Sequence, residues 1–110
     1  PEFRRAIEEP IAGAIAIAPG VPLVITEGNY LLMEEQDAPG THWHAVHALL
    51  DEVWYVDMDD RLRIERLTRR HELHGRSPQA ARDWVAQVDE PNARRIAATR
   101  GRADWVLRWG

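Results

Sequence analysis

The stretch VWYVDMDDRLRIERLTRRHELHGRSP, residues 53–78, decides the fold. Its opening VWYVDM is rich in β-branched and aromatic residues, which is the composition of a strand. The residues that follow are strong helix formers without Gly or Pro, and Asp59 can cap their amino end. We therefore predict a strand over residues 53–58 that leads directly into a helix over residues 60–74.

Further strand signals lie on both sides of this unit. Two short apolar runs bounded by Gly and Pro, residues 14–18 and 22–26, predict buried strands. Because their apolarity is continuous rather than alternating, we expect both faces to be covered, as in a parallel sheet. ADWVLRW, residues 103–109, predicts a last strand.

Helix signals alternate with these strands. Apolar residues at helical spacing predict a helix over residues 42–52. Ser77 followed by Pro78 is typical of a helix start, and that helix should run through Val88. Asp89-Glu90-Pro91 repeats the start signal for a helix that ends near Thr99. Alternating strands and helices indicate an α/β fold with a parallel sheet.

Composition excludes several classes of protein. A chain of 110 residues with 45% hydrophobic and 29% charged residues fits one folded domain. There is no Cys for a disulfide or a thiolate site, and the longest apolar run is too short to span a bilayer, so a cytoplasmic setting without membrane contact is expected. The net charge of -4 argues against nucleic acid as a partner. The opening Pro1, in place of Met, suggests a fragment.

The basic residues are all Arg. A Walker A loop, G-x-x-x-x-G-K-[ST], needs its Lys at the β- and γ-phosphates of a nucleotide. This chain therefore contains no Walker A loop.

Glu27 is the first candidate for chemistry. It stands at the carboxyl end of the predicted strand over residues 22–26 and precedes Gly28, which allows close approach of backbone or ligand. Ligands of open α/β sheets bind at this end of the strands. Such a carboxylate can hold Mg²⁺ through water or orient an acceptor hydroxyl, or it can simply cap the next turn.

An arginine cluster follows on the predicted helix. Its members are Arg61, Arg63, Arg66, Arg69, Arg70 and, just beyond the helix, Arg76. Arg63, Arg66 and Arg70 share one helix face. Guanidinium groups match phosphate oxygens and keep their charge, which suits a transferring phosphoryl group. The alternative is a solvated face paired with Asp59, Asp60, Glu65 and Glu72.

Two other patterns favour structural roles. His44 and His47, like His71 and His74, lie three residues apart, but no third ligand completes a metal site with either pair. The run VDEPNARR, residues 88–95, places Asn92 at a helix start, where anions can bind but ordinary start signals also occur.

Four strings in order resemble a known family: PLVITEGNYLL, LLDEVWYVDMDDRLRIERLTRRHELHGRSPQAARDWV, VDEPNARRI and TRGRADWVL. They are similar to the nucleoside/nucleotide kinases among the P-loop proteins, relatives of uridine kinase, phosphoribulokinase and bacterial pantothenate kinase. The resemblance covers nearly the whole chain. It implies one partial P-loop kinase domain over residues 1–110, with a lid over about residues 59–77.

The resemblance also implies roles for single residues. Glu27 corresponds to an acid near the Mg²⁺–phosphate site, which contacts the metal through water, and Arg66 and Arg70 correspond to catalytic lid arginines. Arg76, Arg100 and Asp104 would bind the nucleotide, and Phe3, Arg4, Tyr30 and Asn92 would bind the acceptor. The opening resembles a segment that reads P-x-F-D-R in the family, so Arg4 stands where an Asp is expected.

The family further implies an upstream strand, the P-loop and a catalytic Asp. That strand would lie between the strands formed by residues 22–26 and 53–58, and without it both would keep unpaired backbone groups. We therefore expect the 110 residues to fold poorly alone or to pair with a partner strand.

The expected function is that of the carboxyl-terminal part of an ATP- and Mg²⁺-dependent kinase. The parent would transfer the γ-phosphoryl group to a hydroxyl of a nucleoside, a sugar or a related metabolite, and the fragment alone would be inactive. The alternative is a non-catalytic α/β module that binds an anion or an acidic partner through the arginine helix. The acceptor and the oligomeric state stay open.

Overall fold

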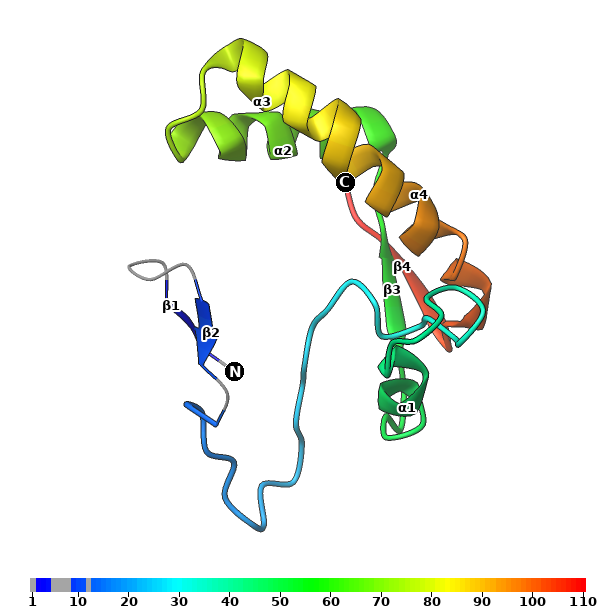
Figure 1. Ribbon diagram of the computed structural model, residues 1–110. Coiled ribbons are helices and arrows are strands. Elements are labelled where there is room, and N and C mark those ends of the chain that lie inside the picture. Colours follow the sequence, from blue (N-terminus) through cyan, green and yellow to red (C-terminus); the bar gives the residue numbers. More distant parts are fainter. Residues whose placement is uncertain (1, 5–8, 12) are drawn as a thin grey trace.

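The computed structural model describes residues 2–4, 9–11 and 13–110 and shows two small sheets and a row of helices (Figure 1). In chain order the elements are β1 (Glu2–Arg4), β2 (Glu9–Ile11), α1 (Trp43–His47), β3 (Trp54–Asp57), α2 (Asp60–Leu73), α3 (Pro78–Trp84), η1 (Val85–Asp89), α4 (Glu90–Ala97), η2 (Arg100–Arg102) and β4 (Trp105–Arg108). The architecture is α/β, as the alternating pattern predicts.

The strands predicted over residues 53–58 and 103–109 correspond to β3 and β4, which pair in parallel. Trp54 lies opposite Trp105, and Asp57 lies opposite Arg108. Asp104 closes the beginning of this pair, because its carboxylate accepts a hydrogen bond from the Val53 backbone N–H at 2.7 Å while its own N–H donates to the Val53 carbonyl at 2.9 Å. Both strand predictions are confirmed.

Helix α2 leaves the carboxyl end of β3 as predicted. The Asp59 carboxylate accepts a hydrogen bond from the Leu62 N–H at 3.1 Å, which satisfies one of the amide donors that every helix start leaves open. The helix continues to Leu73, and Gly75 then adopts a φ of +95°, a left-handed value that suits Gly at the end of a helix.

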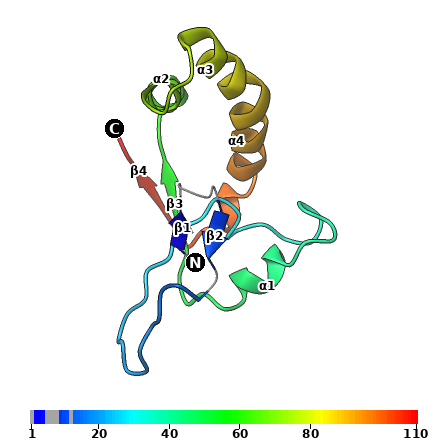
Figure 2. The same cartoon turned by 60° about the vertical axis from the view of Figure 1, so that its left-hand side comes forward.

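Helices α3, η1 and α4 form one continuous rod (Figure 2). Its start is the predicted one, since Ser77 Oγ accepts a hydrogen bond from the Ala80 N–H. Helix α4 begins at Glu90, where the start signal predicts it, but Asp89 keeps helical dihedral angles and makes no capping bond, so the rod continues through it. The turn is instead π-helical, with the Glu90 N–H donating to the Val85 carbonyl. Pro91, which lacks an N–H, follows at once, and such local widening accommodates Pro within a helix.

Residues 14–26 differ most from the prediction. They form no strand but an extended loop, and Leu23 and Ile25 are 70% and 85% exposed. A strand in a parallel sheet needs a hydrogen-bonding neighbour. The only neighbours formed in the described part of the chain are β3 with β4 and β1 with β2, so this apolar loop has nothing to pair with.

The predicted helix over residues 42–52 is shorter than expected. It ends at His47, and Leu49 beyond it is 80% exposed. A helix of this length gains little from its own hydrogen bonds and depends on packing. Beyond Leu49, Leu50 is half-buried and Val53 is buried, so these two side chains pack although the helix has ended.

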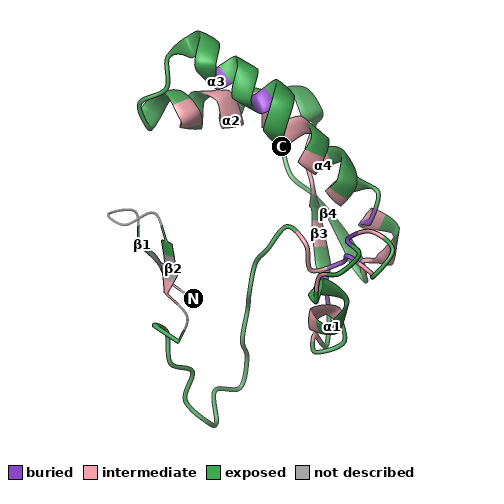
Figure 3. Cartoon of the chain, in the orientation of Figure 1, coloured by how far each residue is buried: buried purple, intermediate pink, exposed green. Residues whose placement is uncertain are grey.

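Two groups of buried residues make up a small core (Figure 3). Ala81 and Val85 lie on the rod, which packs against α2. Leu32, Met33 and Ala38 lie in the loop before α1, and Val53 and Thr99 complete the set. No helix of the described residues is long and apolar enough to cross a membrane.

Candidate functional site at the carboxyl ends of the parallel strands

An open cavity of about 280 Å³ lies where β3 and β4 end. It is lined by Asp57, Met58, Asp59, Arg108, Trp109 and Gly110. The carboxyl ends of parallel strands share one edge, where the backbone turns away and leaves space for a ligand. The parallel register of β3 and β4 therefore creates this site.

Charged groups of both signs surround the cavity. Arg100 Nη2 lies 3.0 Å from Asp57 Oδ2, and the Trp109 N–H donates to the Asp57 carbonyl at 2.8 Å. Arg108 is exposed and has no ion pair among the residues that the structure describes. An anionic group entering the cavity would meet that guanidinium without displacing a partner.

Helix α2 starts at this edge and brings one further cation to the cavity lining. Arg66 reaches back along the helix, with Nη1 3.8 Å from the sulfur of Met58 in the cavity lining. Arg61, Arg69 and Arg70 are exposed and form no ion pair with any described residue. Asp60 and Glu90 both pair with Arg63, and no other arginine of α2 forms an ion pair with a described residue. The arginine face is therefore mostly unneutralised.

Arg63 is the exception in the cluster. Its guanidinium lies 2.9 Å from Asp60 and 2.6 Å from Glu90 on α4. Partial burial opposes its charge, but the bonds to Glu90 and Asp60 outweigh burial and raise the pKa of Arg63. Arg63 thus ties α2 to the rod and is not available to a ligand.

Two contacts join the rod to the end of α2 and the turn after it, one between a His and an Asp and one between an Arg and a Trp. His71 Nε2 lies 2.8 Å from Asp89 Oδ2. The Arg76 guanidinium lies 4.0 Å from the ring centre of Trp84, a cation–π contact. His71 therefore serves the packing of the helices, and the described residues contain no group of three or more side chains suited to a metal ion.

Other residues predicted for the site lie away from the cavity lining. Glu27 is exposed, in the loop without strand pairing. The Tyr30 ring packs edge-on against Trp43, with ring centres 5.4 Å apart. Asn92 lies half-buried in the first turns of α4, and Asp104 joins β3 to β4. Phe3 and Arg4 belong to the β1–β2 hairpin, and the Phe3 side chain lies outside the described part of the structure.

The sequence interpretation missed Asp57 and Arg108. Both stand at the carboxyl end of a correctly predicted strand, so the rule that selected Glu27 would also have selected them. Which strands end side by side could not be read from the spacing.

Comparison with known proteins finds related sequences but no related solved structure. The chain is 34% identical over 102 residues to the ATP-dependent kinase-like protein notR' of Aspergillus versicolor, covering 91% of this chain and 56% of that protein. It is 26% identical over 107 residues to the uncharacterized protein YggC of Escherichia coli, covering 97% of this chain and 42% of YggC. It is 30% identical over 76 residues to the ATP-dependent kinase YFH7 of Zygosaccharomyces rouxii, covering 64% of this chain and 19% of that kinase.

The chain thus spans about half the length of the first two relatives and less of the third. No protein-family model matches it, and no solved structure matches it. Two of the three relatives carry kinase names, which points to a kinase-related group.

Proposed function

We propose that this chain is the carboxyl-terminal part of an ATP-dependent small-molecule kinase of the P-loop type. The whole protein would transfer the γ-phosphoryl group of ATP to a hydroxyl of a nucleoside, a sugar or a related metabolite. The observation that carries the proposal is the unneutralised Arg66 of α2, which reaches Met58 in the lining of the cavity at the ends of β3 and β4. The similarity to proteins named ATP-dependent kinases supports it.

The chemistry explains why arginines are needed here. Phosphoryl transfer spreads negative charge over the oxygens of the moving group, and catalysis consists mainly of positioning and charge stabilisation. Arg66 and Arg70 would contact the transferring group, and Arg76 and Arg100 would contact the nucleotide. Since Arg100 pairs with Asp57 and Arg76 stacks on Trp84, those two would hold the nucleotide from fixed positions.

For Mg²⁺ this chain would supply one oxygen donor, the exposed carboxylate of Glu27. Mg²⁺ prefers oxygen ligands, keeps several waters and needs only one or two carboxylates from the protein. Glu27 would hold it through water, and the ion would neutralise phosphate charge. The remaining phosphate contacts require a Walker A lysine, which this chain lacks.

The exposed loop over residues 14–26 is consistent with the P-loop part of the proposal. In the whole protein, a further strand would pair with residues 22–26 on one side and with β3 on the other. Without that strand, Leu23 and Ile25 would be exposed as they are here. Under this proposal, the rest of the protein buries Leu23 and Ile25. The 110 residues alone would not catalyse phosphoryl transfer.

An ATP-consumption screen of the whole protein with nucleosides, sugars and pantothenate-like alcohols tests the function. We expect Mg²⁺-dependent ADP formation that requires one class of acceptor, and none from residues 1–110 alone. Absence of acceptor-dependent turnover across the screen would refute the kinase proposal.

The second candidate is a non-catalytic module that binds an anion or an acidic partner. The exposed Arg61, Arg69 and Arg70 favour it, because they are available without disrupting any ion pair of the described residues. It would be preferred if the whole protein bound ATP or polyphosphate in a calorimetric titration but turned over no acceptor. Nucleic acid and membranes are not among the partners that we propose.

A further inference from the structure

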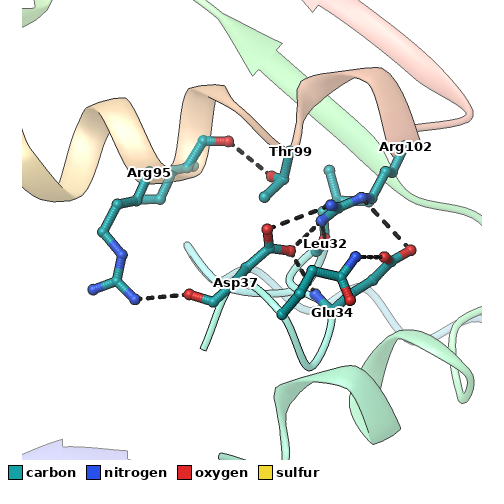
Figure 4. A network of polar contacts seen from close by, with 8 residues as sticks. Leu32, Glu34, Asp37, Arg95, Thr99 and Arg102 are labelled. Carbon is teal, nitrogen blue, oxygen red and sulfur yellow. Dashed lines mark hydrogen bonds and ion pairs between the residues drawn. The ribbon is translucent and has the colours of Figure 1, made fainter. Parts of the chain in front are cut away.

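Asp37 is held by two arginines from a distant part of the chain (Figure 4). Arg102 in η2 binds both carboxylate oxygens, through Nη1 to Oδ2 and through Nη2 to Oδ1 at 3.4 Å. Arg95 on α4 donates to the Asp37 carbonyl at 3.0 Å. The Glu34 N–H adds a bond to Asp37 Oδ2 at 2.8 Å.

Arg102 also binds the turn directly. Its Nη1 donates to the Leu32 carbonyl at 2.9 Å, and its Nε lies 3.6 Å from Glu34 Oε1. One guanidinium thus contacts a backbone carbonyl and two carboxylates of the same loop. A planar group with five donors can make such a set of bonds, whereas the ammonium of Lys cannot reproduce its geometry.

The charge state of the pair is stable at neutral pH. The hydrogen bond from Arg102, with that from the Glu34 backbone, holds the pKa of Asp37 below its usual value. The same bond raises the pKa of Arg102. Both groups are therefore ionised at neutral pH.

The loop held in this way carries Tyr30, for which the resemblance to the kinase family implies a role in acceptor binding. The Met33 N–H donates to the Tyr30 carbonyl at 3.1 Å, so Tyr30 begins the turn that contains Leu32. Met33 is only 2% exposed and Leu32 only 5%, which fixes the turn on its apolar side. Glu27 precedes this turn by a few residues, so a shift of the turn would move both Tyr30 and Glu27.

We propose that Arg102 is a positioning residue, which holds the turn at Tyr30 in place for the acceptor through Asp37 and the Leu32 carbonyl. This positioning role rests on the proposed kinase function, because only a kinase of this kind would bind an acceptor. Arg102 itself need not touch the acceptor. Its guanidinium sets where the turn that begins at Tyr30 lies relative to α4 and β4.

The test uses the whole protein and four variants: Arg102→Gln, Arg102→Lys, Asp37→Asn and the double variant Arg102→Gln/Asp37→Asn. Steady-state kinetics give the KM for acceptor and for ATP separately. Hydrogen exchange over residues 28–41 reports the turn itself. Arg82→Gln is the matched control, because Arg82 is an exposed arginine that donates a hydrogen bond to Gln79 within α3.

We expect Arg102→Gln to raise the acceptor KM about tenfold, the change that roughly 1.4 kcal/mol produces, with the ATP KM within about twofold of the wild type. Exchange over residues 28–41 should quicken, and Arg102→Lys should recover part of both effects. The double variant should be little worse than either single change, because the two residues act as one unit.

Three results would overturn the role: faster exchange with an unchanged acceptor KM, equal changes in the acceptor and ATP KM values, or full additivity in the double variant. If the wild-type whole protein phosphorylates no acceptor, the proposed function fails and the positioning role falls with it. Exchange in Arg102→Gln would then still decide whether Arg102 holds the turn.

Discussion

His71 of α2 and Asp89 of η1 meet at 2.8 Å, Nε2 to Oδ2, although the sequence separates them by a full helical hairpin. The contact lies beside the edge-on packing of His71 on Trp84, with ring centres 6.5 Å apart. It joins the helix that carries the exposed arginines to the rod formed by α3, η1 and α4.

Breaking this contact should loosen the hairpin. Asp89→Asn removes the carboxylate from His71 and should lower the free energy of unfolding by about 1 kcal/mol, the usual net value of one intramolecular hydrogen bond. Urea denaturation of the whole protein at pH 7 measures it. Glu72→Gln is the control, because Glu72 is exposed and its side chain has no hydrogen bond or ion pair with a described residue.

The cap of α3 gives an independent prediction. Ser77→Ala removes the hydroxyl that accepts from the Ala80 N–H, which should cost about 1 kcal/mol. Ser77→Gly should cost less despite lacking the hydroxyl, because Gly is tolerated at caps. Equal unfolding midpoints for the wild type and Ser77→Ala would show that the cap bond adds nothing.

Stability should depend on pH through Asp37. Because its pKa is lowered in the folded state, the unfolded chain takes up a proton first as the pH falls. The stabilisation is therefore complete well above the unfolded value of about 3.9 and is lost as the pH falls through the lower folded value. The urea midpoints of the wild type and Asp37→Asn should differ at pH 7 and converge under strong acid. A difference that stays constant would contradict this sign.

Arg66 offers the sharpest test of the proposed site. Arg66→Ala in the whole protein should lower kcat by about 10²–10³, the usual effect of removing one donor that stabilises developing negative charge. Arg82→Ala should leave kcat within about twofold, since ordinary surface changes have small effects. Equal rates for wild type and Arg66→Ala would remove Arg66 from the catalytic group.

The apolar loop predicts a difference between this chain and the whole protein. Ile25 is 85% exposed, so Ile25→Ala should change the stability of residues 1–110 by less than about 0.5 kcal/mol. If a further strand covers it in the whole protein, the same change should cost about 2–5 kcal/mol there. Small effects in both proteins, measured by urea denaturation, would refute the proposed pairing.

Local signals were sufficient for β3, α2, the start of α3 and β4. Each is specified within its own segment, by β-branched residues, by a run without Gly or Pro, or by a capping side chain such as Asp59. The prediction failed where the structure of a segment depends on other parts of the chain. Residues 22–26 have the composition of a strand but no partner, and Asp89 has the signal of a helix start but lies inside a continuous rod.

The sequence by itself determined that VWYVDM forms a strand, that the arginine-rich stretch after it forms a helix and that no Walker A lysine is present. These properties depend on side-chain shape, backbone preference and residue identity, which act over a few positions. Only the tertiary structure decided which arginines are neutralised. Arg63 and Arg66 look alike in the sequence, yet the first is paired with Glu90 and the second reaches the cavity at Met58. The difference arises because folding brings α4 to one of them and the end of β3 to the other.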